Sequence, residues 1–222
     1  MFCIPIIAKN TEDAFKKMAS ATPLADIMEI RLDLMDSFDL GPIIRSSLKP
    51  ILITYRSDKE GGMGKADPDI AAGYLISALQ EGADLIDVEL SMSGTLRKKI
   101  FDVRGETGII ISTHIKEGTP PRDELKRIFD DSVSAGGDIV KIVTMARRWD
   151  DNLRVLELIP EARDMGVEII AFCTGPLGRM SRLFSLLMGA HMTFTSIEKG
   201  QESADGQIPI MEMKELLEFF TP

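Results

Sequence analysis

Short apolar segments recur along the chain, and longer segments of mixed apolar and polar residues separate them. Eight of the short segments are rich in Val, Ile and Leu and lack a polar face, which is typical of parallel strands covered on both sides. They begin at intervals of 23 to 35 residues. The eight predicted strands span residues 2–8, 27–33, 50–56, 85–90, 108–114, 138–145, 168–174 and 191–197.

The segments between the strands carry signals of helix ends. Threonine, aspartate and proline are favoured where a helix begins, and glycine is favoured where it ends. On this basis helices are predicted to begin at Thr11, Asp67-Pro68, Pro120 and Asp150. Helix ends are predicted at Gly82, Gly136 and Gly166. A further helix at 211–220 is expected to cover the fold.

The order of these elements predicts the architecture. Alternation of strand and helix builds right-handed crossovers between parallel strands, and eight such units can close into a barrel. We therefore predict an α/β fold in which residues 1–222 form a single domain, a (β/α)8 TIM barrel. An open doubly wound sheet is the alternative. It would carry a G-x-G-x-x-G turn after the first strand, where this chain has Ala8-Lys9-Asn10-Thr11.

Composition and charge narrow the class of protein. The chain has 35 acidic and 26 basic side chains, a net charge of −9 that would repel nucleic acid. No run of eighteen apolar residues and no secretory signal is present, so we expect no membrane span. Cys3 and Cys173 lie far apart in apolar strands and are expected to be buried free thiols. These features indicate a cytoplasmic protein that binds a small molecule.

Charged residues stand in several of the apolar strands. The active site of a parallel barrel lies at the carboxyl ends of its strands, so these positions are candidates for chemistry. If Glu29 and Arg31 face inward, they meet at the mouth of the barrel, because alternate residues of a strand share a face. The candidates at these positions are Glu29, Arg31, Asp33, Arg56, Asp87, Glu89, His114 and Lys141.

Lys141 is the most specific of these signals, because it lies between Val140 and Ile142 in a strand that is otherwise apolar. Lysine is seldom buried without a partner or a function. Burial and neighbouring cations lower the pKa of a lysine and so favour the neutral amine, which attacks carbonyl groups. The alternative is a structural ion pair with Glu29 or Glu89.

The two histidines of the chain differ in position. His114 ends the strand next to that of Lys141 and could transfer protons near neutral pH. His191 begins the last strand, at the amino end of the barrel, where a structural role is expected. A metal ion is not expected, since no H-x-x-x-H motif is present and arginines lie nearby.

Six motifs in order along the whole chain resemble those of the type I 3-dehydroquinate dehydratases, the Schiff-base-forming enzymes of the shikimate pathway. They lie at strand ends or in the loops that follow. The motifs are EIRLD (29–33), TYRSDKEGG (54–62), STH (112–114), DIVKIVTM (138–145), GPLGRMSRLFSLLMGAHMTF (175–194) and SADGQIP (203–209).

The resemblance implies a role for each matching residue. Lys141 would form an imine with the ketone of 3-dehydroquinate, His114 would act as general acid and base, and Glu60 would orient the histidine. Arg182 would bind the substrate carboxylate, because its planar fork suits that group. The implied substrate-binding residues are Glu29, Arg31, Arg56, Arg182, Ser203 and Gln207.

The resemblance also carries expectations about the rest of the site. Glu29, Arg31 and Arg56 are expected to hold ring hydroxyls and to balance one another's charges. Ser203 and Gln207 are expected to close over the substrate carboxylate. No cofactor is expected, since the lysine supplies the electron sink. A homodimer is implied as well.

The chain departs from the family pattern at two places. Asp205 stands where the family usually has the proline of S-A-P-G-Q, which adds a negative charge near an anionic substrate. Ile115-Lys116 follows the histidine where an acid or aromatic pair would be expected. The segment 197–207 is either a lid that orders on the substrate or a plain solvated loop.

Two other functions remain open from the residues alone. One is a lysine-dependent aldolase for sugar phosphates, which would need a glycine-rich phosphate site after strand seven or eight. The other is a binding barrel without catalysis, in which Lys141 and His114 are buried structural residues.

Overall fold

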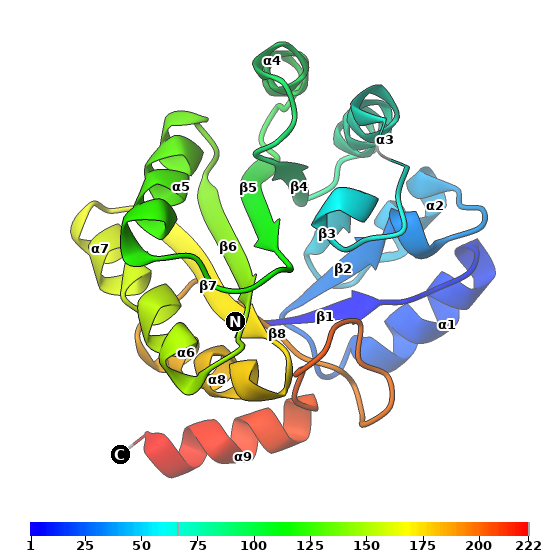
Figure 1. Ribbon diagram of the computed structural model, residues 1–222. Helices are drawn as coiled ribbons and strands as arrows, with labels where there is room; N and C mark the ends of the chain where they lie inside the picture. Colours follow the sequence, from blue (N-terminus) through cyan, green and yellow to red (C-terminus); the bar gives the residue numbers. More distant parts are fainter. Residues whose placement is uncertain (66, 222) are drawn as a thin grey trace.

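Eight parallel strands form one curled sheet in the computed structural model, which describes residues 1–65 and 67–221 (Figure 1). The ladder runs from β7 back through β1 to β8. It does not extend from β7 to β8 within the described residues, but the backbone N–H of His191 donates to the carbonyl oxygen of Ile169 at 2.8 Å. The strands are β1 (Phe2–Ile6), β2 (Ile27–Arg31), β3 (Ile51–Thr54), β4 (Leu85–Glu89), β5 (Gly108–Ile115), β6 (Ile139–Met145), β7 (Glu168–Thr174) and β8 (Thr193–Phe194).

The nearly closed ring confirms the predicted (β/α)8 barrel, and the open doubly wound alternative is wrong. Helices surround the strands on the outside (Figure 1). Short 3-10 turns lie at η1 (Leu32–Leu34), η2 (Asp58–Glu60) and η3 (Pro176–Gly178). The helices are α1 (Thr11–Ala21), α2 (Leu40–Ser46), α3 (Pro68–Gln80), α4 (Gly94–Asp102), α5 (Arg122–Ser134), α6 (Trp149–Leu156), α7 (Leu158–Asp164), α8 (Arg179–Leu187) and α9 (Ile210–Phe220).

Local sequence sets most of the helix ends. α1 begins at Thr11 as predicted, and the side chain of Asn10 caps it by accepting from the N–H of Asp13 at 3.0 Å. α3 begins at Pro68 after an Asp67 cap. The predicted helix ends at Gly82, Gly136 and Gly166 are confirmed, with φ of +84°, +87° and +69°.

Two helix predictions need correction. The helix expected from Pro120 begins at Arg122, because Pro121 is its extended cap. The single helix expected from Asp150 is two helices, α6 and α7. Pro160 lies in the first turn of α7 and has no backbone N–H to donate to the last turn of α6. The hydrogen bonds of α6 therefore do not continue into α7. α2, α4 and α8 were not predicted from the sequence.

The inward side chains of the strands form two layers. The lower layer is apolar and belongs to a buried cluster that includes Cys3, Ile27, Leu52 and Ile139. Two positions further along β2 to β6, the inward side chains become polar, since alternate residues share a face. The barrel therefore has a dry floor with a polar layer above it, at the carboxyl ends of the strands.

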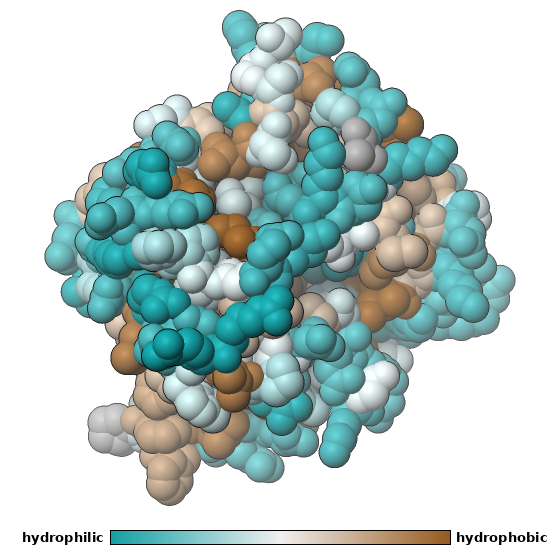
Figure 2. All heavy atoms as spheres, in the orientation of Figure 1, coloured by the Kyte–Doolittle hydropathy of each residue, from teal (hydrophilic) through white to brown (hydrophobic). Residues whose placement is uncertain are grey.

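Other expectations are met outside this layer. Cys3 and Cys173 are buried free thiols, as predicted. Nδ1 of His191 lies 2.9 Å from a carboxylate oxygen of Glu168, at the amino end of β7. Hydrophilic side chains cover most of the face in Figure 2, while Phe219 and Phe220 of α9 are exposed.

Among the helices of residues 1–65 and 67–221, none combines the length and the apolar character that crossing a lipid bilayer requires.

Candidate active site

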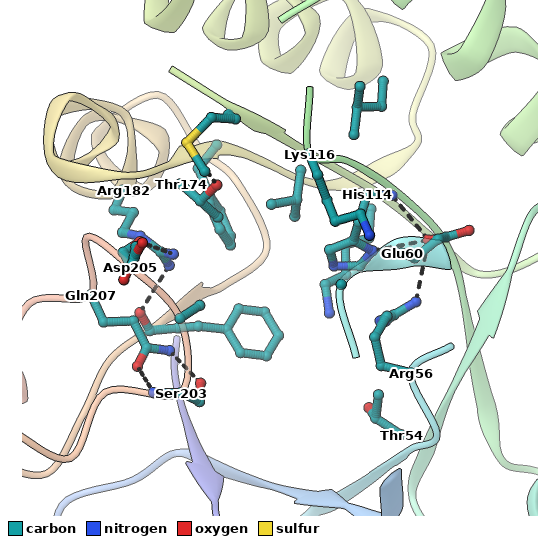
Figure 3. Close-up of a pocket in the computed structure, with 18 of the residues that line it drawn as sticks. Thr54, Arg56, Glu60, His114, Lys116, Thr174, Arg182, Ser203, Asp205 and Gln207 are labelled. Atoms are coloured by element: carbon teal, nitrogen blue, oxygen red, sulfur yellow. Dashed lines mark hydrogen bonds and ion pairs between the residues drawn. The ribbon is translucent and has the colours of Figure 1, made fainter. Parts of the chain in front are cut away.

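A cavity of about 270 Å³ opens at the carboxyl ends of the strands. In Figure 3, Arg182 and Ser203 lie on one side of it, and His114 and Glu60 lie on the other. The structure brings all nine candidate residues to this one cavity, while their individual roles stay predictions. They are Glu29, Arg31, Arg56, Glu60, His114, Lys141, Arg182, Ser203 and Gln207.

Lys141 projects from β6 into the cavity, and only 3% of its surface is exposed. Its Nζ donates to Oδ2 of Asp87 at 2.9 Å and lies 4.3 Å from the centre of the Phe194 ring. The ion-pair partner is therefore Asp87, and the alternative interpretation, a pair with Glu29 or Glu89, is wrong about the partner. The pairing leaves the amine facing the cavity.

Asp87 is fully buried on β4 and holds together several groups of the polar layer. Its Oδ1 accepts from the hydroxyl of Ser112 at 2.5 Å, and its Oδ2 lies 2.7 Å from a guanidinium nitrogen of Arg56. Burial alone would raise the pKa of Asp87, but the charges of Arg56 and Lys141 outweigh it and hold that pKa well below its usual range. Asp87 is therefore an ionised counter-ion at neutral pH.

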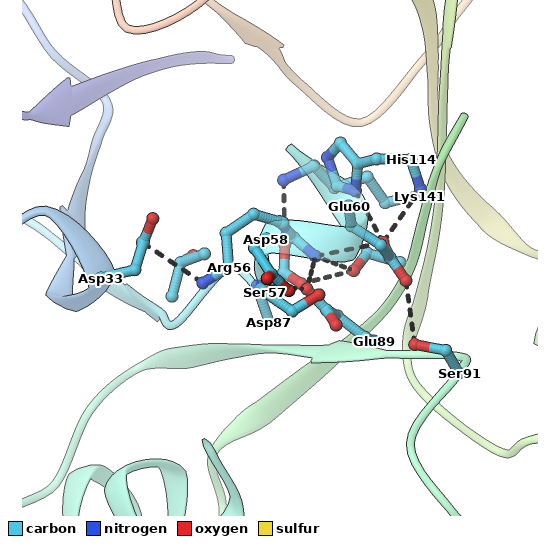
Figure 4. Close-up of polar contacts among 12 residues, drawn as sticks. Asp33, Arg56, Ser57, Asp58, Glu60, Asp87, Glu89, Ser91, His114 and Lys141 are labelled. Atoms are coloured by element: carbon cyan, nitrogen blue, oxygen red, sulfur yellow. Dashed lines mark hydrogen bonds and ion pairs between the residues drawn. The ribbon is translucent and has the colours of Figure 1, made fainter. Parts of the chain in front are cut away.

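His114, at the end of β5, is held by Glu60 of η2 (Figure 4). Oε2 of Glu60 accepts from the backbone N–H of His114 at 3.0 Å and lies 3.2 Å from its Nδ1. The other oxygen of Glu60 accepts from the hydroxyl of Ser91 at 3.0 Å. An acceptor at Nδ1 favours the tautomer with hydrogen on that atom, so Nε2 is left to accept a proton.

Burial sets the charge state of this pair. It lowers the pKa of His114 well below its ordinary value, and the charges of Arg56 and Lys141 lower it further. Burial also raises the pKa of Glu60 to about 7, against the opposing charge of Arg56. The imidazole is therefore neutral at neutral pH and can act as a base.

Arg56 lies among carboxylates, with only 4% of its surface exposed (Figure 4). One guanidinium nitrogen lies 3.1 Å from Glu89 and 3.5 Å from Glu60, and the other pairs with Asp87. The nitrogen near Glu89 also donates to the hydroxyl oxygen of Ser112 at 2.9 Å. Arg56 therefore holds the acids of the polar layer in place.

The expectation that Glu29, Arg31 and Arg56 balance one another is wrong. Arg31 makes a two-pronged contact with Asp33, at 2.8 and 2.7 Å. Glu29 accepts from the hydroxyl of Thr54 on the neighbouring strand at 2.8 Å. Arg31 is therefore paired with the turn that follows its own strand, and Glu29 with the neighbouring strand.

Arg182 of α8 is the cation on the opposite wall, and 1% of its surface is exposed. Its two terminal nitrogens donate to the carbonyl oxygens of Phe194 and Asp205, both at 3.4 Å, and its guanidinium stacks 4.4 Å from the Phe172 ring. Within the described residues, no carboxylate pairs with it and its buried Nε has no hydrogen-bond partner. Burial lowers the pKa of Arg182 to about 9. The guanidinium is suited to a carboxylate that enters the cavity.

The segment that carries Ser203 and Gln207 is folded over the cavity. The amide of Gln207 donates to the Ser203 hydroxyl at 2.9 Å and accepts from the Ser203 backbone N–H at 2.8 Å. The Asp205 carbonyl accepts from the N–H of Gly175 at 3.0 Å. Gly206 has φ +81°, and a Cβ there would lie 2.2 Å from the Gly175 oxygen, so this approach requires glycine.

The sequence analysis gave no role to four residues of the site. Asp87 and Asp33 were identified as charged residues in the strands, but no partner was predicted for either of them. Phe172 and Phe194 form apolar walls of the cavity. Alternation along β7 and β8 could have identified both rings as inward-facing, since Phe172 lies two positions after Ile170 and Phe194 two positions after Met192.

The comparisons with known proteins agree with this geometry. A family model described as type I 3-dehydroquinase matches residues 2–221. A 3-dehydroquinate dehydratase of Methanococcus maripaludis is 34% identical over 220 residues, covering 98% of this chain and 99% of the relative. One from Thermococcus gammatolerans is 36% identical over 218 residues, covering 96% of this chain and 95% of the relative.

Solved structures give the same result. The type I 3-dehydroquinate dehydratase of Clostridium difficile, solved with covalently modified comenic acid, has a TM-score of 0.88 at 28% identity and covers 99% of this chain and 91% of that chain. The 3-dehydroquinate dehydratase of Aquifex aeolicus has a TM-score of 0.80 at 28% identity, with 100% and 99% covered. Neither a sugar-phosphate aldolase nor a binding barrel without catalysis accounts for this agreement. The chain belongs to the type I 3-dehydroquinase family and is an enzyme that dehydrates 3-dehydroquinate, a reaction of the shikimate pathway.

Proposed function

We propose that this enzyme dehydrates 3-dehydroquinate through an imine on Lys141, with His114 as general acid and base. The observation that carries the proposal is a buried amine and a partly buried, neutral imidazole on neighbouring strands that line one cavity. The unpaired guanidinium of Arg182 on the opposite wall supports an anionic substrate. The two walls would hold the carboxylate and the ketone of one small molecule.

The first steps form the imine. Lys141 attacks in its unprotonated form, so its Nζ first gives up a proton, for which Nε2 of His114 is the proposed acceptor. A bond forms between Nζ and the carbonyl carbon as the second carbon–oxygen bond breaks. The oxygen takes two protons in turn, both given up by Nζ and passed on through His114, and leaves as water. Asp87 then faces a protonated imine instead of an ammonium, and it stabilises that cation in the same position.

The next steps eliminate the ring hydroxyl. The protonated imine acidifies the adjacent carbon, and Nε2 of His114 removes a proton from it. The resulting enamine expels the hydroxyl, to which protonated His114 gives the proton, so that water leaves. Hydrolysis of the imine then frees Lys141 and releases 3-dehydroshikimate. The chemistry is complete without a cofactor.

The remaining candidates are proposed to bind and orient the substrate. Arg182 would take the carboxylate, with Ser203 and Gln207 exchanging their mutual hydrogen bonds for contacts with it. Glu29 and Arg31 would contact ring hydroxyls from the cavity wall. Arg56, which also lines the cavity, would mainly hold the acids that act on Lys141 and His114.

We further propose that residues 1–222 act as a single catalytic domain in a cytoplasmic homodimer. The buried free thiols support a reducing location. The family resemblance supports the dimer, which size-exclusion chromatography with light scattering would test directly.

Steady-state assays of variants test the chemical roles. Loss of a general acid and base lowers kcat by about 100-fold to 10,000-fold, which is the effect expected for His114→Gln. Lys141→Ala should remove dehydration altogether, and Lys141→Arg should not restore it, because arginine stays protonated. Near-normal kcat in either lysine variant would contradict the imine.

A further inference from the structure

Lys116 spans the two loops that carry the catalytic pair His114 and Glu60. We propose that Lys116 is a positioning residue that holds the turn of residues 58–61 so that the Glu60 carboxylate stays against His114. The inference rests on the proposed function, since it assumes that this pair performs the acid and base steps.

The contacts of Lys116 reach across the turn on both sides of Glu60. Its Nζ donates to the backbone oxygen of Asp58 at 2.8 Å. Its stem lies against Gly61, where a Cβ would come within 3.1 Å of the lysine Cδ. Glu60 lies between these two contacts, and Figure 3 shows Lys116 beside His114 at the rim of the cavity.

Few other bonds connect this turn with the end of β5. Within residues 1–65 and 67–221, three hydrogen bonds join positions 57–64 to positions 108–121. Two of them connect His114 with Glu60, and the third comes from Lys116. The turn is also tied to other strands, through Ser57 to Glu89 and through Met63 to Asp33. Among the described residues, the hydrogen bond of Lys116 is therefore the one that connects this turn with the end of β5 without involving His114 or Glu60.

This tie matters because the Glu60 contacts are sensitive to small movements. The distance from Oε2 to Nδ1 of His114 is already 3.2 Å, near the long end of a hydrogen bond. Burial raises the free energy of an ionised Glu60, so a shift of the turn that lengthened its contacts would weaken its hold on His114. Without the tie, the imidazole would lose its preference for hydrogen on Nδ1.

The chain offers a matched control at Lys59. This lysine is exposed on the same turn, and its side chain has no hydrogen-bond or ion-pair partner among the described residues. Lys59→Met and Lys116→Met remove the same charge from the same rim of the barrel. A difference between them therefore reports the contact with Asp58 and not the loss of a positive charge.

Steady-state kinetics with 3-dehydroquinate give the first readout. One lost hydrogen bond corresponds to about a threefold to tenfold change, so kcat should fall by that factor in Lys116→Met. KM should change by less than about twofold, since the lysine acts on the turn and not on the substrate. Lys59→Met should match the wild type, and Lys116→Arg should restore most of kcat.

The tautomer of His114 gives a readout that does not depend on turnover. The chain has 2 histidines, so a His191→Gln background leaves His114 as the single imidazole in 15N NMR spectra. The form with hydrogen on Nδ1 should dominate in that background and with Lys59→Met. With Lys116→Met, the population should shift toward hydrogen on Nε2.

The outcomes separate the inference from the proposed function. Equal kcat and equal tautomer populations in the two methionine variants would overturn the positioning role, and so would a rise in KM with unchanged kcat. If His114→Gln left turnover intact, the proposed function would fail instead, while the tautomer comparison would still decide whether Lys116 holds the turn.

Discussion

Oδ2 of Asp87 lies 2.9 Å from Nζ of Lys141 and 2.7 Å from a guanidinium nitrogen of Arg56, so one carboxylate oxygen faces two buried cations. Lys141 lies on β6 and Arg56 lies just past the end of β3, and the carboxylate on β4 joins them across the barrel interior. This arrangement places an amine, its counter-ion and an imidazole around one buried point. Several consequences of it can be measured.

Asp87→Asn should be costly for stability. It leaves Lys141 and Arg56 buried without their shared counter-ion, and breaking such a pair costs about 3–5 kcal/mol. The free energy of unfolding in urea should fall by that amount, and imine formation should slow because the cation is no longer stabilised. Asp102→Asn, which removes an exposed partner of Lys98, should cost less than about 1 kcal/mol. Equal losses in the two variants would contradict the account.

Arg182→Met should separate stability from binding. The guanidinium is buried without a carboxylate, so replacing it by an apolar side chain should leave the free energy of unfolding unchanged or raise it. KM should rise by about tenfold or more, since a charged hydrogen bond of about 1.5–3 kcal/mol to the substrate carboxylate is lost. Arg179→Met, on the exposed side of α8, is the control. A variant that folds poorly but binds normally would exclude Arg182 as the carboxylate site.

The inward face of the strands could be predicted from the sequence because its period is two. Lys141 lies two positions from Ile139, and Glu29 lies two positions from Ile27, so each pair shares a face. The apolar runs therefore indicated both the barrel and its polar layer. Motif order along the chain then identified which polar residues gather at one cavity.

The partner of Lys141 could not be predicted in this way. Asp87 and Lys141 lie on β4 and β6, with β5 between them, and their relative height depends on the stagger of the closing barrel. Ser112 pairs with Lys141 in one ladder and with Glu89 in the other, so simple counting along the strands favours Glu89. α2 was missed because Gly41 and Pro42 are poor helix formers, although burial of Ile43 stabilises it.

Glu60→Gln should change the pH dependence of stability. Burial raises the pKa of Glu60 from 4.5 to about 7, so the folded protein holds a proton that the unfolded chain has released between those values. The stabilisation from this group is full below pH 4.5 and is lost as the pH rises through about 7. The free energy of unfolding in urea should therefore fall in the wild type, relative to Glu60→Gln, as the pH rises over this range. Above about pH 7 the difference between the two proteins should become constant. Parallel curves would show that Glu60 has an ordinary pKa.

Asp205→Asn should improve substrate binding at low ionic strength. Asp205 lines the cavity, and its carbonyl oxygen accepts from Arg182, so its charge lies near the proposed carboxylate site. KM should fall by about twofold to fivefold, an effect of about 1 kcal/mol or less that salt should screen. Glu198→Gln, on the same segment but outside this cavity, should leave KM unchanged. An equal change in both variants would assign the effect to net charge.

The proposed mechanism requires a covalent imine between Lys141 and the substrate. Borohydride reduces such an imine to a stable amine, so enzyme treated with borohydride and 3-dehydroquinate can be digested and its peptides weighed by mass spectrometry. We predict one reduced adduct on the peptide that contains Lys141, present in His114→Gln at a slower rate and absent in Lys141→Ala. An adduct on another lysine, or full turnover without any trapped adduct, would contradict the account.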